Sequence, residues 1–308
     1  MARIEERRVE VGGISLDVAD TGPAGAPTLL LVNGLGTQRT DWPDELLAGL
    51  QAAGLRLVMV DHRDVGRSTW IDDARVTRED LVRAHRGERF TSAYGLTDLA
   101  ADLVGVLDAL DVDAAHVLGQ SMGGMVAQRL ALGWPQRVRS LISVMSTTGA
   151  RDVGQATREV ARATSARTPT ERAAWIAANI ERSRLTNSPT LFDEVRVRAR
   201  FAAAWDRGGI NPDGKLRQLV AIAADGDRTA ALADLAVPTL VIHGAQDPVV
   251  GVDGGHATAE AIPGARLLVL DEMGHDLPLP LLPTIVAAVA SHVLHAARTR
   301  TAVRGQSG

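Results

Sequence analysis

The sequence contains no cysteine, which excludes disulfide bridges, thiolate metal ligands and a cysteine nucleophile. Lysine is almost as scarce, because Lys215 is the only one and arginine supplies the rest of the positive side-chain charge. We attribute this bias to genomic base composition and predict no function from it. The lack of disulfides fits a reducing compartment, so we expect a cytoplasmic protein.

The chain also lacks a strong net charge: the formal charge is -4 and the isoelectric point is about 6.1. Nucleic acids and anionic lipids bind proteins with strongly basic surfaces. Since this chain has no such excess of positive charge, neither is predicted as a partner. Long apolar runs are missing too. The longest, such as Leu279 to Ala290, are broken by prolines and fall below the roughly 20 residues that span a bilayer. The charged segment 1–8 is not followed by the apolar stretch of a secretory signal, so we expect neither membrane association nor secretion.

What is present is enough apolar sequence for one large core, since 45% of the 308 residues are hydrophobic. Eight short runs favour β-structure: 9–11, 14–18, 28–32, 56–60, 115–118, 141–144, 239–242 and 266–270. The first two flank two glycines and predict a hairpin. The others are almost continuously apolar, which is typical of strands buried on both faces of a parallel sheet. Helical patterns alternate with them, so we predict an α/β protein with a mostly parallel central sheet flanked by helices.

One long segment interrupts this alternation. Residues 150–232 contain no convincing strand, and Ala, Arg, Glu and Trp recur there at helical spacing. We predict a helical cap inserted after the sixth strand, a core formed by 1–149 and 233–298, and a flexible tail at 299–308. The cap holds several of the few aromatic residues, among them Trp175, Phe201 and Trp205. They either pack the cap helices together or line a substrate pocket.

A candidate nucleophile lies in Gly119-Gln120-Ser121-Met122-Gly123, which follows a predicted strand and opens a helical stretch. This is the strand-turn-helix setting in which G-x-S-x-G presents an exposed serine on a strained turn. Glycines two positions on either side let the strand and the helix approach closely. We therefore predict Ser121 as a catalytic nucleophile.

A serine hydroxyl needs a base to accept its proton, and the base needs an acid that fixes its tautomer. His275 follows the predicted strand 266–270, and Asp247 follows the predicted strand 239–242. Both positions lie where loops leave the carboxyl ends of strands, and the chain order Ser, Asp, His is the one used by this type of enzyme. We predict His275 as the base and Asp247 as its partner.

Other residues compete for these two roles. The competing histidines are His116, His243, His256, His292 and His295, and the competing aspartates are Asp225, Asp227 and Asp271. The first two histidines lie in predicted strands, where we expect a core residue and a prop for the loop of Asp247. The other three are expected to face solvent. Two of the aspartates fall in the predicted cap, and the third is too close in sequence to His275.

An oxyanion hole should combine the backbone N–H of the residue after the nucleophile with one from the loop after the third strand. The first is Met122. The second loop reads Val32-Asn33-Gly34-Leu35-Gly36, and we predict Leu35 as the donor.

These motifs resemble the α/β-hydrolase superfamily over nearly the whole chain, and within it the aclacinomycin methylesterase group of polyketide esterases. The segments that carry the resemblance are 41–43 (DWP), 61–68 (DHRDVGRS), 119–123 (GQSMG), 237–239 (VPT) and 274–275 (GH). The chain departs from the pattern at Asn33, where many members have histidine, and at Leu35, where the methylesterase has glycine. A bulkier Leu35 is expected to narrow the acyl side of the pocket. The segment 61–68 is expected to be a buried, ion-paired loop that braces the active face.

No cofactor is predicted. Gly209 to Lys215 has the glycine and lysine spacing of a phosphate loop, but Leu216 replaces its Ser/Thr and no strand precedes it. Metal-binding and dinucleotide-binding motifs are missing.

The leading hypothesis is hydrolysis of a small-molecule carboxylic ester or lactone through an acyl-enzyme. The same triad could instead cleave a thioester or a carbon–carbon bond of a diketone, or carry out perhydrolysis. A ligand-binding receptor with negligible turnover is the alternative from another class. The sequence specifies neither the acyl and alcohol groups nor the oligomeric state.

Overall fold

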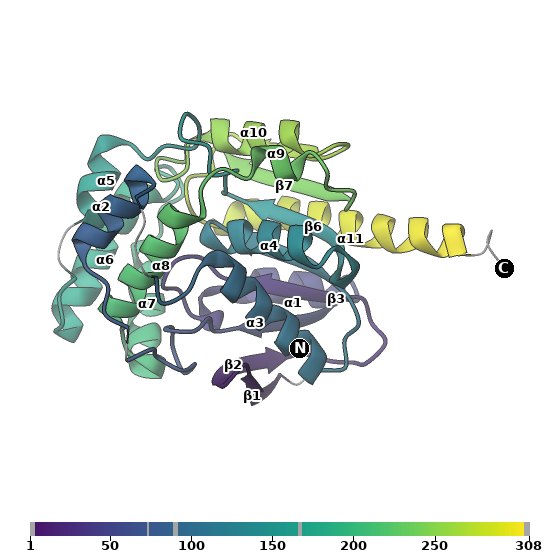
Figure 1. Ribbon diagram of the computed structural model, residues 1–308, viewed down its shortest axis with the longest axis horizontal. Helices are drawn as coiled ribbons and strands as arrows, with labels where there is room; N and C mark the ends of the chain where they lie inside the picture. The colour runs from purple at the N-terminus through teal and green to yellow at the C-terminus, as the bar shows by residue number, and fades with distance from the viewer. Residues whose placement is uncertain (1–3, 73, 89–91, 166–167, 305–308) are drawn as a thin grey trace.

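A computed structural model describes residues 4–304, apart from 73, 89–91, 166 and 167. Its centre is an eight-stranded sheet in the order β1-β2-β4-β3-β5-β6-β7-β8 (Figure 1). The strands are β1 (Glu5–Val11), β2 (Ile14–Asp20), β3 (Thr28–Val32), β4 (Arg56–Val60), β5 (Ala115–Gln120), β6 (Val138–Val144), β7 (Thr239–Gly244) and β8 (Arg266–Leu270). Pairing is antiparallel from β1 to β4 through β2 and parallel elsewhere. The predicted mostly parallel α/β fold is confirmed.

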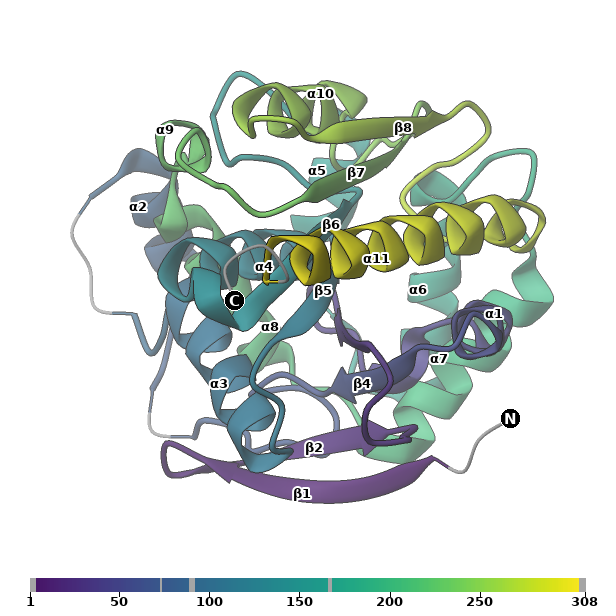
Figure 2. The same ribbon diagram turned by 90° about the vertical axis from the view of Figure 1, so that its right-hand side faces the viewer.

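Helices cover both faces of the sheet, because its central strands are apolar on both sides. On one face lie α3 (Leu96–Ala109) and α4 (Met122–Gly133), and on the other lie α1 (Asp44–Ala52) and α11 (Leu282–Arg304), as Figure 2 shows. Each pair closes its own apolar core against the strands. The remaining core elements are α10 (Val252–Ala261), which packs on β7 and β8, and the short helices η1 (Arg39–Asp41), η2 (Pro135–Arg137) and η3 (Leu279–Leu281).

The last helix corrects the expectation that prolines break its apolar run. Leu279–Ala297 reaches 19 residues with a mean hydropathy of 1.6, so by length and composition this segment could span a membrane. The prolines do not interrupt it, since they fall in η3 and the first turn of α11, where no helical N–H is lost. In the structure, 33% of this segment is buried: α11 contacts α1, β6 and β7, and it buries Ile285, Val289 and Val293 against them. Helix α11 extends to Arg304, because no glycine or proline occurs in its last turns, and residues 305–308 lie outside the described part. The flexibility of the tail at 299–308 stays a prediction.

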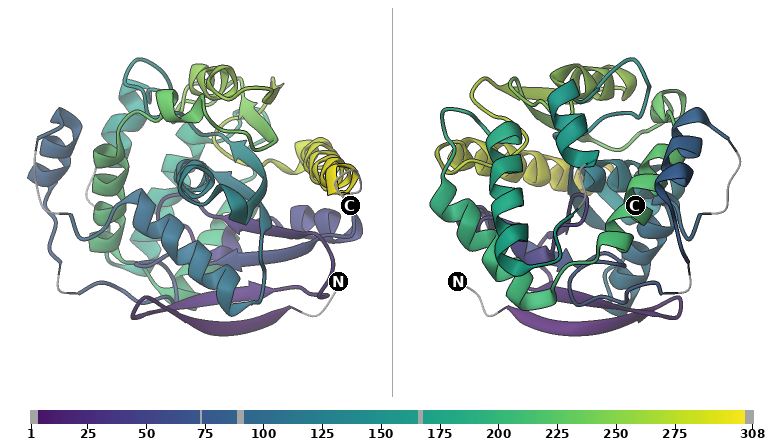
Figure 3. Two further views of the ribbon diagram at one scale, coloured as in Figure 1. Left: turned by 45° about the vertical axis from the view of Figure 1, so that its right-hand side comes forward. Right: turned by 90° about the vertical axis from the view of Figure 1, so that its left-hand side faces the viewer.

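Among its described residues, the segment between β6 and β7 contains helices joined by turns and loops, and no strand. It forms α5 (Arg158–Ser165), α6 (Arg172–Thr186), α7 (Glu194–Gly208), α8 (Pro212–Asp225) and α9 (Thr229–Leu232). Helices α5 to α8 gather at one end of the molecule together with α2 (Arg78–Arg86), which contacts α8 (Figure 1; Figure 3, right). Loops from the carboxyl ends of β3 and β8 meet these helices, so the helices stand over the edge where the predicted site residues leave the sheet.

Candidate active site

Ser121 occupies a sharp turn between β5 and α4. Its backbone has φ 54° and ψ −123°, a strained conformation for a residue with a side chain. The turn is fixed on both sides: the Ser121 N–H donates to the Val144 carbonyl at 2.9 Å, and the Ser146 hydroxyl donates to the Ser121 carbonyl at 2.9 Å. These bonds hold the strained turn in one conformation.

The flanking glycines are required by close backbone contacts. A Cβ added to Gly119 would lie 2.1 Å from the Gly123 carbonyl oxygen, and one added to Gly123 would lie 2.1 Å from the Val32 carbonyl oxygen. Both distances are far below van der Waals contact, and backbone atoms have little freedom to move away. The spacing of the motif is thus explained by the crossing of β5, α4 and the end of β3.

We expect Gly123→Ala to lower the free energy of unfolding by about 2–3 kcal/mol, because the new methyl group must displace backbone in a packed core. Urea unfolding measures this loss. Gly133→Ala is the matched control, since it lies in the same helix with no atom within 4 Å of its added Cβ, and it should change stability by less than about 1 kcal/mol. Equal effects of the two variants would contradict the steric explanation.

The three predicted triad residues lie together. The His275 Nε2 atom is 2.9 Å from Ser121 Oγ, and His275 Nδ1 is 2.7 Å from Asp247 Oδ2. When Nδ1 carries the proton and donates to the carboxylate, Nε2 is free to accept the serine proton. The arrangement is a continuous chain of hydrogen bonds from a hydroxyl to a buried carboxylate.

The surroundings of the Asp247 carboxylate stabilise its ionised form. Its Oδ1 atom accepts the backbone N–H groups of Val249 at 2.8 Å and Val250 at 2.9 Å. Burial alone would raise the pKa of this carboxyl, but the charge of His275 and hydrogen bonds from His243, His275 and Val250 hold its pKa well below the ordinary value. A negative charge therefore faces His275 at neutral pH and stabilises the imidazolium that proton transfer would create.

The competing histidines are placed elsewhere. His243 is buried with Nε2 2.8 Å from the Val250 carbonyl oxygen and 3.5 Å from Asp247 Oδ2, so it supports the loop of Asp247. His116 is buried in β5 and hydrogen-bonded to Ser140. His256 and His295 are exposed as predicted. The expectation for His292 was wrong: it is buried, because it lies on the face of α11 that packs against the sheet.

The competing aspartates do not approach His275. Asp225 forms ion pairs with Arg129 and Arg228, Asp227 caps α9 through Thr229, and the side chain of Asp271 is exposed.

The loop after β3 brings the predicted oxyanion donor to Ser121. A Cβ added to Gly34 would lie 3.4 Å from the Ser121 Cβ, and Leu35 is the next residue. Asn33 stabilises this loop by donating to the Gln38 carbonyl at 2.7 Å and accepting from the Trp42 indole at 2.7 Å. The N–H of Leu35 meets no acceptor in the described part of the chain, and the N–H of Met122, at the first position of α4, has no intrahelical partner.

The segment 61–68 forms a network of ion pairs with the neighbouring helices. Asp61 is fully buried and accepts from the Arg39 N–H at 2.6 Å and from Arg207 of α7 at 2.7 Å. Asp64 accepts two hydrogen bonds from Arg217 of α8, from Nε at 2.8 Å and from Nη2 at 2.7 Å. This segment therefore connects the active edge of the sheet to the helices above it. Sequence reasoning missed both arginines, because nothing in an arginine-rich segment distinguishes a buried partner from an exposed one.

A cavity of about 110 Å³ adjoins the loop after β3. Leu35, Trp175, Phe201 and Lys215 are among its lining residues. Trp175 also packs edge-on against Phe201, with ring centroids 5.4 Å apart, so these two residues both pack the helices together and line the cavity. Their contact with a substrate stays a prediction. Trp205 contacts Trp175 and is not among the described residues that line the cavity.

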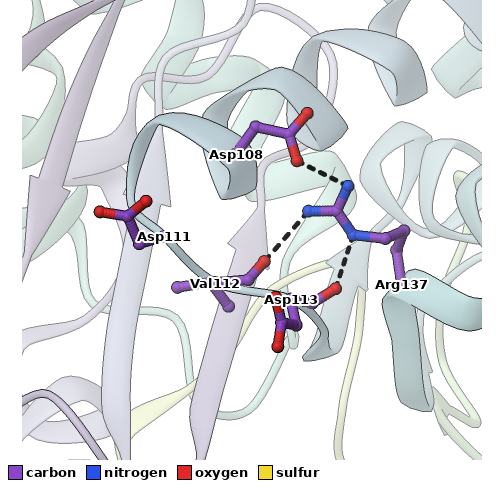
Figure 4. Close-up of a pocket in the computed structure, with 5 residues that line it drawn as sticks. All are labelled: Asp108, Asp111, Val112, Asp113 and Arg137. Atoms are coloured by element: carbon purple, nitrogen blue, oxygen red, sulfur yellow. Dashed lines mark hydrogen bonds and ion pairs between the residues drawn. The ribbon is translucent and has the colours of Figure 1, made fainter.

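A second pocket lies where β5 begins, at the opposite edge of the sheet from Ser121 (Figure 4). It is lined by Asp108, Asp111, Val112, Asp113 and Arg137. Arg137 is already engaged by the Asp108 carboxylate and the carbonyls of Val112 and Asp113, as the dashed lines in Figure 4 show. Its polar groups are those of a structural ion pair. Among the described residues, no group of His, Asp and Glu side chains has the arrangement of a metal site.

Ser188 connects the helical segment to the loop of His275. Its buried hydroxyl accepts the Gly274 N–H at 2.9 Å and donates to Asp276 Oδ1 at 2.7 Å, while the His275 N–H donates to the Thr186 carbonyl at 2.8 Å. The residues on both sides of His275 are thus held by one short stretch after α6. Sequence reasoning missed Ser188, because no motif surrounds it.

We expect Ser188→Ala to lower kcat by about tenfold, because small displacements of a proton-transfer group reduce the rate steeply. It should also cost about 1–3 kcal/mol in unfolding free energy through the unsatisfied Gly274 amide. Ser188→Thr, which keeps the hydroxyl, should recover most of kcat. Thr190→Ala is the control, since that hydroxyl makes only an exposed 3.4 Å contact with Glu272. A loss of stability with unchanged kcat would show that Ser188 does not position His275.

Comparison with known proteins agrees with the fold described above. Residues 27–280 match the family described as alpha/beta hydrolase fold. The chain is 32% identical over 292 residues to the rhodomycin D methylesterase DauP of Streptomyces sp. strain C5, covering 88% of this chain and 91% of that protein. It is 29% identical to a 2-hydroxy-6-oxononadienedioate/2-hydroxy-6-oxononatrienedioate hydrolase of Cupriavidus pinatubonensis, covering 83% and 82%. Among solved structures, a meta-cleavage product hydrolase from Pseudomonas fluorescens IP01 superposes with a TM-score of 0.75 at 21% identity, covering 94% and 98%.

Proposed function

Because the chain belongs to the α/β-hydrolase family, we propose that it is a serine esterase that cleaves a carboxylic ester through an acyl-enzyme intermediate. The observation that carries the proposal is the hydrogen-bonded chain of Ser121, His275 and Asp247, with links of 2.9 and 2.7 Å. The likeness to rhodomycin D methylesterases makes a methyl ester of a larger carboxylic acid the first substrate to test. The sequence contains no metal-binding or dinucleotide-binding motif, so the proposed mechanism uses no cofactor.

The proposed cycle has two halves. Ser121 Oγ attacks the ester carbonyl while His275 Nε2 accepts its proton, and the imidazolium then returns this proton to the departing alcohol. Water, activated by the same nitrogen, releases the acid and restores the serine. Asp247 holds the tautomer throughout. The N–H groups of Leu35 and Met122 stabilise the oxyanion, and each such donor is worth about 3 kcal/mol of barrier.

Helices α5 to α8 act as a cap in this proposal, over a core formed by 1–149 and 233–298. Support comes from the polar contacts that join the two parts: Arg207 with Asp61, and Arg217 with Asp64. Both pairs are buried or nearly so, which favours a cap held in a defined position over the site. A small-molecule ester enters beneath it. We also propose a cytoplasmic location, as the lack of cysteine suggests.

The test combines turnover with labelling. With p-nitrophenyl acetate, an activated ester that acylates fast, we expect deacylation to be rate-limiting, so that a burst of nitrophenol equal to the enzyme precedes steady turnover. A fluorophosphonate should attach to Ser121, as peptide mass spectrometry would establish. One acylation without further turnover would favour the receptor alternative, and labelling at any other residue would exclude the proposed nucleophile.

Carbon–carbon bond hydrolysis is the second candidate, favoured by the likeness to the dienedioate hydrolase. The two reactions share the triad and differ in the leaving group, an alcohol in one and a carbanion equivalent in the other. A panel holding methyl esters and a vinylogous 1,5-diketone decides between them through kcat/KM. We expect the esters to be the better substrates.

A further inference from the structure

The only lysine of the chain lies beside the oxyanion loop. Lys215 is in the first turn of α8, and its methylene carbons would lie 3.6 Å from a Cβ added to Gly36. Gln218, on the same helix, fixes this arrangement by accepting the Gly36 N–H at 2.8 Å. Gly36 is one residue from Leu35, which lines the same cavity as Lys215. Lys215 therefore lies in space beside the loop that holds the proposed oxyanion donor, Leu35.

The ammonium of Lys215 has no partner of opposite charge. Within the described residues it makes no ion pair and no side-chain hydrogen bond, although the side chain is half-buried and lines the cavity. Burial, together with the positive charge of Arg182, lowers the pKa of Lys215 to about 8. The group still carries a proton at pH 7. A half-buried cation without a partner of opposite charge gains free energy when an anion binds beside it.

A second cation on the same cavity wall is also unmatched. Arg182 of α6 donates to the Asn179 side chain at 2.7 Å, and its Nε is buried with no acceptor. No carboxylate among the described residues pairs with it, and burial lowers the pKa of this guanidinium. A guanidinium with free donors is suited to a carboxylate, which can accept two of them at once.

The carboxylates that line this cavity are already engaged. Both oxygens of Asp64 are bound by Arg217, and Oδ2 also accepts the Tyr94 hydroxyl at 2.7 Å. Asp41 accepts the Gln38 N–H at 2.6 Å and lies 3.9 Å from Arg200. Neither is bonded to Lys215 or Arg182. Two of the residues that line the cavity, Lys215 and Arg182, are therefore cations without a carboxylate partner among the described residues.

We propose that Lys215 and Arg182 form an anion-binding subsite, and that the ester cleaved at Ser121 carries a free carboxylate that this subsite holds. The proposal rests on the proposed esterase function and specifies its substrate class as monoesters of dicarboxylic acids. A volume of about 110 Å³ accommodates a carboxylate and a few carbons of its chain. The carboxylate replaces water around two half-buried cations, so it adds binding energy that a neutral ester of equal length lacks.

The experiment compares monomethyl adipate with methyl heptanoate, a neutral ester of similar length, at pH 7. For Lys215→Met and Arg182→Met, we expect kcat/KM on monomethyl adipate to fall by about ten- to a hundredfold, mainly through KM. Methyl heptanoate should change by less than about threefold. Lys215→Arg, which retains the charge, should keep most of the preference, and Arg184→Met controls for loss of an exposed arginine on the same helix.

Competition identifies the anion. Free adipate should inhibit methyl heptanoate hydrolysis by the wild type and lose this effect in Lys215→Met, whereas inorganic phosphate should inhibit weakly. Stronger competition by phosphate would overturn the carboxylate assignment. Equal losses on both esters, or no preference for monomethyl adipate in the wild type, would overturn the subsite while leaving Ser121-dependent hydrolysis intact. Hydrolysis of methyl heptanoate that survives Ser121→Ala would instead overturn the esterase mechanism itself.

Discussion

Replacement of Ser121 by alanine is expected to lower kcat for ester hydrolysis by about 10⁴- to 10⁶-fold. The variant keeps the fold, since the strained turn depends on backbone hydrogen bonds to Val144 and Ser146 and on the neighbouring glycines. The substitution removes Ser121 Oγ, the atom that lies 2.9 Å from His275 Nε2. Residual rate would come from the oxyanion donors and from substrate binding alone. Steady-state hydrolysis of p-nitrophenyl esters measures the loss.

Ser143→Ala provides the matched control. Ser143 is buried in β6 with an unpartnered hydroxyl, so its removal deletes a neighbouring serine oxygen without breaking a side-chain hydrogen bond. We expect its kcat to remain within about threefold of the wild type. Activity retained in Ser121→Ala, with native thermal stability and after exclusion of contaminating esterase, would refute the proposed mechanism.

Asp247→Asn is expected to lower kcat by about 10⁴-fold with little change in structure. The backbone N–H groups of Val249 and Val250 bind Oδ1, so the asparagine carbonyl must stay there and its NH₂ group must face His275. An NH₂ group donates only, which forces Nδ1 to become the acceptor and moves the proton to Nε2. Nε2 can then no longer accept the serine proton.

Asp271→Asn is the control for this substitution, because Asp271 lies near His275 in sequence but has an exposed side chain. Its kcat should match the wild type. The comparison is made as a pH–rate profile from pH 5 to 9, with unfolding temperature measured on the same samples. An Asp247→Asn enzyme within tenfold of wild type across that range would show that another group orients His275.

The parts of the site that follow from local sequence were predictable. The turn at Ser121 is encoded by five consecutive residues, since the glycines at 119 and 123 are required by atoms of the same turn and of the adjoining strand. The strands that precede Asp247 and His275 are recognisable as apolar runs, and parallel strands end at a common edge. Chain order and strand position were therefore enough to predict which three side chains would lie together.

Burial within amphipathic segments was less predictable. His292 was expected to face solvent, but it is buried. Lys215 was attributed to base composition, but it lines the cavity beside the loop after β3. Which face of a helix turns inward depends on the surface it meets, and that surface is made by residues far along the chain. The same holds for the arginines of α7 and α8, whose carboxylate partners are more than a hundred residues away in sequence.

The sequence by itself determined the class of fold, the turn that exposes Ser121 and the order of the triad, because each depends on neighbouring residues or on strand periodicity. Only the tertiary structure decided how the site is completed. Ser188 meets Gly274 across 86 residues, and Gln218 meets Gly36 across 182. Such contacts form where the packing of the helices between β6 and β7 brings distant segments within hydrogen-bond distance, and no local sequence pattern specifies which segments will meet.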